Sequence, residues 1–219
     1  MDGFMLQFIN GLKTTVLLAL ASGTLGMALG LLVAAGRLSR FKPISLAAGV
    51  YTTVIRGVPE LIIILLIYFG GTVAISAVFG RYVEINAFLA GVVSLTVVFG
   101  AYAAEIFRGA VLSIPAGQIE AARSLGLHPW QTWMLVILPQ MLRIALPALA
   151  NQWISLVKET SLISIVGLTD IMRVAAIGAG SLRAPLTFYL AASVIYLALT
   201  SIALVAFSLL ERRFAVPGR

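Results

Sequence analysis

Residues 119–139 read IEAARSLGLHPWQTWMLVILP, and this stretch decides how the rest of the chain is organised. It carries the charged side chains Glu120 and Arg123 in a chain that is 61% hydrophobic. Apolar segments of membrane length precede it. Pro115 before the stretch and Gly126 within it are typical of the start and the end of a helix. We therefore predict a short, polar helical element beside membrane-crossing segments.

The composition places the chain in the membrane class. Its 219 residues have a mean hydropathy of +1.07 and only 11% are charged, whereas soluble domains have about 25% charged residues. The absence of cysteine excludes disulfides and thiolate metal sites, and the lone histidine, His128, excludes a multi-histidine metal site. The net charge of +7 is spread over short loops, which favours a membrane protein over a nucleic-acid-binding surface. We expect an all-α membrane protein without a metal site.

Five segments are long and apolar enough to cross a hydrocarbon core, which needs about 20 mostly apolar residues. The first exceeds the core of a cleaved signal, which spans about 7–15 residues, so we expect it to be retained. Residues 44–55 fit a helix at the membrane interface, whereas residues 167–185 have the glycines and charges of an extramembrane loop. Pro139 and Pro147 predict that the helix is interrupted in the segment leading into the fourth crossing. The five predicted crossings cover about residues 11–36, 60–79, 86–107, 144–166 and 187–210.

The distribution of basic residues predicts the orientation of the chain. With five crossings the termini lie on opposite sides, and lysine and arginine gather on the cytoplasmic side. We therefore expect the amino terminus outside and the carboxyl terminus in the cytoplasm, with residues 115–133 cytoplasmic and the loop 167–185 extracytoplasmic. The cytoplasmic side would hold Arg37, Arg40, Lys42, Arg56, Arg108, Arg123, Arg143, Arg212, Arg213 and Arg219, and the outer side Arg81, Arg173 and Arg183.

The opening stretch also resembles a known motif. EAARSLG followed by ILP is similar to the coupling motif of permease subunits of binding-protein-dependent ABC importers. The family pattern is Glu-Ala-Ala, three residues, Gly, nine residues, Ile, one residue and Leu-Pro. Val136 stands at the position of the family's isoleucine, which is a conservative change. The matching residues are Glu120, Ala121, Ala122, Gly126, Leu138 and Pro139.

Further stretches carry the same resemblance to polar amino-acid permeases. Similarity covers about residues 8–213, so the resemblance implies one transmembrane permease domain over 1–219 with the type I ABC importer permease fold. Glu159 stands where the family usually has aspartate. Glu60 and the ending LLERRF resemble the Q-type subunits for histidine/lysine/arginine/ornithine, arginine and opine uptake. The stretches are IRGVPELIIILLIYFG (55–70), AYAAEIFRGAVLSIPAGQIEAA (101–122) and LPQMLRIALPALANQWISLVKETSLIS (138–164).

The resemblance implies a permease in the bacterial inner membrane that works with separate partner subunits. In this family a second permease, homologous or identical, completes the membrane part, a cytoplasmic ATPase dimer binds below, and a periplasmic or lipid-anchored binding protein docks above. The implied substrates are polar amino acids, with basic amino acids and opines favoured. This chain has no G-x-x-x-x-G-K-[ST] phosphate loop, so we expect no enzyme activity and no cofactor on it, with ATP and Mg on the ATPase. The implied ATPase-coupling residues are Glu120, Ala121, Ala122, Arg123, Gly126, Leu138 and Pro139.

Charged side chains at membrane depth mark a candidate substrate path, because they are costly to place there and are often functional. A cationic substrate needs acidic groups, and Lys158 would pair with a substrate carboxylate or with an acidic neighbour. Structural alternatives stay open: Glu105 and Arg108 have the (i, i+3) spacing of an ion pair, and Lys158 with Glu159 can serve as bracing. The candidates are Glu60, Glu105, Asn151, Gln152, Lys158 and Glu159.

Other classes of membrane protein compete with the importer hypothesis. An ATP-independent channel or secondary transporter is the first alternative, but such transporters usually show two internal repeats with broken helices, and none is visible here. A membrane enzyme would need reactive cysteines, paired histidines or a dense carboxylate cluster. A purely structural subunit would not co-purify with a P-loop ATPase. Gly23, Gly26 and Gly30 predict only close helix packing on the first crossing.

Overall fold

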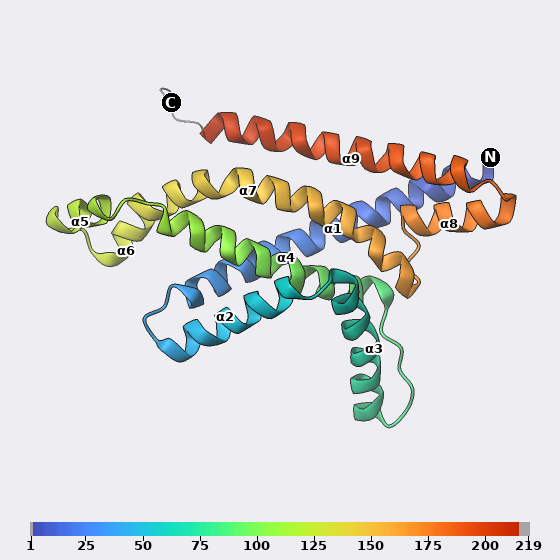
Figure 1. The fold of residues 1–219 in the computed structure, drawn as a ribbon, viewed down its shortest axis with the longest axis horizontal. Coiled ribbons are helices and arrows are strands. Elements are labelled where there is room, and N and C mark those ends of the chain that lie inside the picture. Colours follow the sequence, from blue (N-terminus) through green and yellow to red (C-terminus); the bar gives the residue numbers. More distant parts are fainter. Residues whose placement is uncertain (1, 215–219) are drawn as a thin grey trace.

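The chain folds as a bundle of helices. The computed structural model describes residues 2–214, and every regular element within that range is helical. Figure 1 shows α5 and α6 at one end of the bundle and the start of α1 at the other. The elements are α1 (Asp2–Arg37), α2 (Lys42–Gly57), α3 (Glu60–Phe79), α4 (Ala87–Leu112), α5 (Ala116–Ser124), α6 (Pro129–Thr132), a π-helical turn (Trp133–Ile137), α7 (Leu138–Glu159), a 3₁₀ helix (Thr160–Val166), α8 (Ile171–Leu182) and α9 (Pro185–Phe214).

Five helical segments of the described chain are long and apolar enough to cross a membrane, as the sequence predicts. The crossing predicted at 60–79 matches α3, whereas the other crossings are longer than predicted. The first helix begins early because Phe4 packs edge-on and Phe8 stacks against Phe188 of α9. The segments are Gly3–Arg37, Glu60–Phe79, Ala87–Leu112, Pro129–Val166 and Pro185–Arg213.

The predicted break before the fourth crossing is wrong. The helical path runs without interruption from Pro129 to Val166. A π-helical turn at Trp133–Ile137 leads directly into α7, and Pro139 stands in the first turn of α7 without ending the helical path. Pro147 lies inside the helix without ending it.

The segment predicted as a loop at 167–185 is mostly helical. It forms α8, which begins where the Asp170 side chain accepts a hydrogen bond from the Arg173 backbone N–H at 2.8 Å. Gly178 misled the prediction, because a glycine in a polar segment usually marks a turn. In the structure its missing side chain makes room for the ring of Phe188, which lies where a Cβ atom would be.

The long helices α1 and α4 pack closely, and this contact forms the centre of the bundle. A Cβ atom on Gly26 would lie 2.7 Å from the Phe99 ring, and one on Gly30 would lie 2.6 Å from the Cβ atom of Ala103. Gly23 faces the ring of Trp153 on α7 in the same way. The prediction that these glycines serve helix packing is confirmed.

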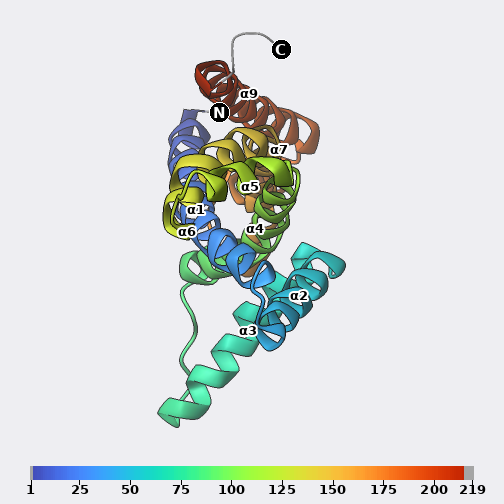
Figure 2. The ribbon, with the colours of Figure 1, turned by 90° about the vertical axis from the view of Figure 1, so that its left-hand side faces the viewer.

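Helices α2 and α3 form an arm beside the bundle. Figure 2 shows α3 leaving the other helices and the segment before α4 returning alongside it. The expected interface helix at 44–55 is longer, as α2, and is tied to α4 because the Tyr51 hydroxyl donates to the Val97 carbonyl at 2.6 Å. The base of α3 is anchored by the fully buried Ile64, so Glu60, in its first turn, lies next to the bundle.

Candidate functional site

The predicted coupling segment is a projecting pair of short helices, α5 and α6, here called the tip (residues 116–132). Helix α5 ends at Ser124 with Leu125 as its C-cap, and Gly126 follows with a φ of +76°. The Gly126 N–H donates to the Arg123 carbonyl at 2.9 Å, and the Leu127 N–H donates to the Ala122 carbonyl at 3.1 Å. Such a left-handed turn favours glycine because it has no Cβ atom.

The surface of the tip mixes charge with apolar side chains. Ala122 is buried, whereas Glu120, Ala121 and Arg123 are exposed. Beyond them Leu125 is 81% exposed and Trp130 is 64% exposed. Large apolar side chains at this exposure next to charged ones are typical of a surface that binds another protein.

Two hydrogen-bonded contacts fix the shape of the tip. The His128 ring nitrogen Nδ1 accepts from the Trp130 N–H at 3.4 Å, and the Gln131 side chain accepts from the His128 N–H at 2.9 Å, which is a capping box for α6. The Gln140 amide donates to the Gln118 side chain at 2.6 Å and links α5 to α7. Sequence reasoning missed this link, because no local spacing relates the two glutamines.

The remaining residues of the motif lie at the base of the tip. Leu138 begins α7 and packs against the hydrophobic core, and Pro139 follows it. The motif is therefore divided: Glu120 to Gly126 form the tip, and Leu138 with Pro139 join the tip to the bundle.

Glu105 is the centre of an ion network that ties three helices together. Its Oε2 accepts from the Arg108 Nε at 3.0 Å, which confirms the predicted (i, i+3) pair. Its Oε1 accepts from the Arg37 Nε at 3.2 Å and from the Thr52 hydroxyl at 3.0 Å. Both carboxylate oxygens are thus engaged within the chain, and Glu105 links α1, α2 and α4.

A second acidic cluster joins α3, α4 and α7. The Tyr102 hydroxyl donates to Glu60 at 3.5 Å, and the Arg56 guanidinium lies 5.3 Å from the centre of the Tyr102 ring. The charges of Glu60 and Lys158 both act on Glu159, which is the last residue of α7. Its Oε2 is buried and has no hydrogen-bond partner among the described side chains.

This cluster contains two groups that sequence reasoning missed, Arg56 and Tyr102. Tyr102 could have been found from the sequence, because it is a polar phenol three residues before Glu105 in an otherwise apolar helix. Arg56 could not have been found, because the sequence places it between two predicted helices, where a basic residue usually belongs to a loop. The cluster holds two carboxylates, one of them with a free buried oxygen, and a phenol, against the single guanidinium of Arg56. This excess of acidic groups favours a cation.

Lys158 is not part of the acidic cluster. Its side chain lines a groove with Tyr189, Tyr196 and Thr200 of α9. It points away from the side chain of Glu159 because consecutive residues on a helix are about 100° apart. Asn151, seven residues earlier, shares the Lys158 side of α7, and Gln152 shares the Glu159 side. The structure therefore groups Glu60 with Glu159 and leaves Glu105 in a separate network, while Lys158 faces α9 but remains near enough for its charge to act on Glu159.

Comparison with known sequences relates the chain to permease proteins of transport systems. The chain matches the family described as binding-protein-dependent transport system inner membrane component over residues 26–216. It is 49% identical over 203 residues to the nopaline transport system permease protein NocQ of Agrobacterium fabrum, covering 90% of this chain and 86% of that protein. It is 40% identical to the arginine ABC transporter permease protein ArtQ of Haemophilus influenzae, covering 97% of this chain and 95% of that protein.

Solved structures agree with the sequence relatives. A chain of an amino acid ABC transporter crystallised with histidines matches with a TM-score of 0.86 and 38% identity, covering 97% of this chain and 96% of that one. A chain of the MetNI methionine ABC transporter shares the fold, with a TM-score of 0.79 at 22% identity over 99% of this chain and 100% of that one. These matches confirm the predicted type I importer permease fold. The chain belongs to the family of binding-protein-dependent transport system inner membrane components.

Proposed function

We propose that this chain is the permease subunit of an ATP-driven importer whose substrates are polar amino acids carrying a cationic group, including opines. The observation that carries the substrate class is the acidic cluster, in which the buried Oε2 of Glu159 has no partner among the described side chains. An uncompensated carboxylate oxygen at membrane depth favours a cationic ligand. The names of the relatives, which specify nopaline and arginine transport, support the same class.

We propose that the tip docks onto a cytoplasmic ATPase dimer, which binds the ATP and Mg²⁺. Exposed Ala121 permits close approach, Glu120 and Arg123 supply charged contacts, and Trp130 supplies an apolar anchor. A second permease and an extracytoplasmic binding protein complete the transporter. On this proposal the last turn of α9, which lies toward the end of the bundle that carries the tip (Figure 1), is on the cytoplasmic side.

The substrate proposal is tested by uptake in proteoliposomes that contain the complete transporter. We expect Glu159→Gln to raise the KM for arginine about tenfold or more, since an interaction with a charged group contributes about 1.5–3 kcal/mol. Glu211→Gln, on α9, is the matched control and should leave the KM unchanged. An unchanged KM in Glu159→Gln would remove the acidic cluster from the substrate path.

The same vesicles test the coupling proposal. Arginine uptake should require internal ATP and the loaded binding protein. Uptake that proceeds without ATP would instead identify the chain as part of a channel or a secondary transporter.

A further inference from the structure

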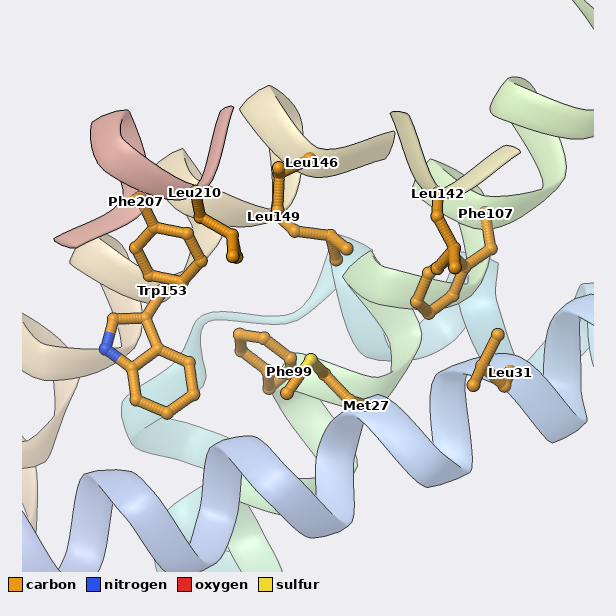
Figure 3. Close-up of a pocket in the computed structure, with 10 residues that line it drawn as sticks. All are labelled: Met27, Leu31, Phe99, Phe107, Leu142, Leu146, Leu149, Trp153, Phe207 and Leu210. Carbon is orange, nitrogen blue, oxygen red and sulfur yellow. The ribbon is translucent and has the colours of Figure 1, made fainter. Parts of the chain in front are cut away.

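An apolar cavity of about 330 Å³ lies between α1, α4, α7 and α9, and none of the residues that line it belongs to the acidic cluster. Figure 3 shows its wall: Phe99 and Phe107 come from α4, Leu149 and Trp153 from α7, and Phe207 from α9. No side chain with a charge lines it. Apolar cavities of this kind stay dry and bind apolar molecules.

The cavity has a closed floor and an open rim. Phe99, Phe107 and Leu149 form the floor and are at most 7% exposed. Leu142 and Leu210 on the rim are 44% and 40% exposed. All five residues belong to helices that are long and apolar enough to cross a membrane, so an apolar rim at this place suits the hydrocarbon of the bilayer.

Basic side chains border one end of this opening. Helices α7 and α9 are in contact and run in opposite directions, as Figure 1 shows, and the rings of Trp153 and Phe207 are 6.0 Å apart. From this contact Arg143 lies about 15 Å back along α7 and Arg213 about 9 Å further along α9, at a rise of 1.5 Å per residue. Both therefore lie toward the same end, and their side chains are long enough to reach the same membrane interface.

The net charge at this end is positive. Arg143, Arg212 and Arg213 are exposed, and Glu211 is the acidic residue among them. Within residues 3–213, the ion pairs of the chain are those of Glu105 with Arg37 and Arg108. The three arginines are thus available to an anion at the membrane surface.

We propose that the cavity is a binding site for an anionic phospholipid, with one acyl chain between α1, α4, α7 and α9 and the phosphate held by Arg143 and Arg213. The apolar floor accounts for the chain, and the basic rim accounts for the headgroup charge. The site does not depend on the substrate or on the ATPase proposed above.

The test uses nanodiscs that contain the assembled transporter and a phospholipid with a photoreactive diazirine in its acyl chain. Phosphatidylglycerol and phosphatidylcholine analogues are compared at equal mole fraction, and the cross-linked peptides of this chain are mapped by mass spectrometry. We expect the phosphatidylglycerol analogue to label the α7 and α9 segments around Leu142 and Leu210 more strongly than the phosphatidylcholine analogue.

Two kinds of variant separate the headgroup from the acyl chain. Arg143→Gln and Arg213→Gln should each lower the labelling by phosphatidylglycerol about fivefold, which is the value of one basic residue near an anionic surface, and leave labelling by phosphatidylcholine unchanged. Leu149→Trp fills the floor and should abolish labelling of the cavity by both lipids. If that variant does not fold, Leu142→Trp at the rim serves the same purpose. Arg81→Gln, in the segment after α3, is the control and should change nothing.

Several results would overturn the proposal. Equal labelling by both lipids would remove the role of the arginines, and labels confined to helices outside the cavity would remove the site. Cross-links from the cavity to the second permease would show that protein covers it.

Discussion

Gly126 has the one backbone conformation in the tip that an ordinary side chain disfavours. Its φ is +76°, while the space around it is open, with no atom within 4 Å of the place that a Cβ atom would take. Any effect of substitution therefore comes from the backbone and not from a clash. Substitutions at Gly126 therefore test the backbone turn without disturbing the packing of the tip.

We expect Gly126→Val to lower uptake about 5- to 30-fold while the protein is still inserted in the membrane. A left-handed conformation costs an ordinary residue about 1–2 kcal/mol, and a β-branched residue tolerates it least. Gly126→Asn should keep most of the activity, because asparagine adopts this conformation more readily. Uptake and binding-protein-stimulated ATP hydrolysis measure the effect.

The control for this prediction is Gly117→Ala. Gly117 also has open space around it but lies inside α5 with an ordinary φ. Uptake by Gly126→Val at the level of the control would show that the turn plays no part in coupling.

Single-residue reasoning predicted short-range partners and missed long-range ones. The pair of Glu105 and Arg108 follows from a spacing of three residues on a helix. Arg37 and Thr52 join it from 68 and 53 positions away, and no sequence pattern relates them. The placement of Lys158 away from Glu159 does follow from helical geometry, but the choice of which one faces the acidic cluster depends on how α7 packs.

At the scale of the element, periodic apolar segments were predictable and glycines were ambiguous. Helix α3 begins and ends where the sequence places it, because Pro59 and Gly80 flank it. Glycines in residues 167–185 also suggested a loop, but that segment forms α8. A glycine needed for close packing and a glycine needed for a turn look alike until the neighbouring helix is known, as with Gly178 and Phe188.

We expect Gly30→Ala to lower the melting temperature of the chain. A Cβ atom there would lie 2.6 Å from that of Ala103 and 3.2 Å from its backbone, which cannot move without shifting α4. Overpacking of this kind costs about 1–3 kcal/mol. Thermal unfolding in detergent, followed by tryptophan fluorescence, gives the change.

Gly3→Ala is the matched control, since no atom lies within 4 Å of a Cβ at that position. If both variants melt at the temperature of the unmodified chain, α1 and α4 are not closely packed at Gly30.

At the scale of the whole molecule, the orientation in the membrane follows from where the charges lie. The tip and the start of α8 lie toward opposite ends of the bundle in Figure 1. The chain has no cysteine, so single cysteine variants report their side without background. Ser124 on the tip and Ser181 on α8 are both exposed.

We expect a membrane-impermeant maleimide to label Ser181→Cys in intact spheroplasts and Ser124→Cys only in inverted vesicles. The excess of basic residues on the side of the tip is the physical reason. The two variants are each other's control, and the opposite pattern of labelling would reverse the proposed orientation.

The uninterrupted helix from Pro129 has a mechanical consequence. It starts in the tip and reaches Glu159, a distance of about 45 Å at 1.5 Å per residue. The helix packs against α4 and α9 between these two points, and a continuous helix that tilts about a point between its ends moves those ends in opposite directions. A push on the tip that tilts this helix would then displace Glu159 in the opposite direction.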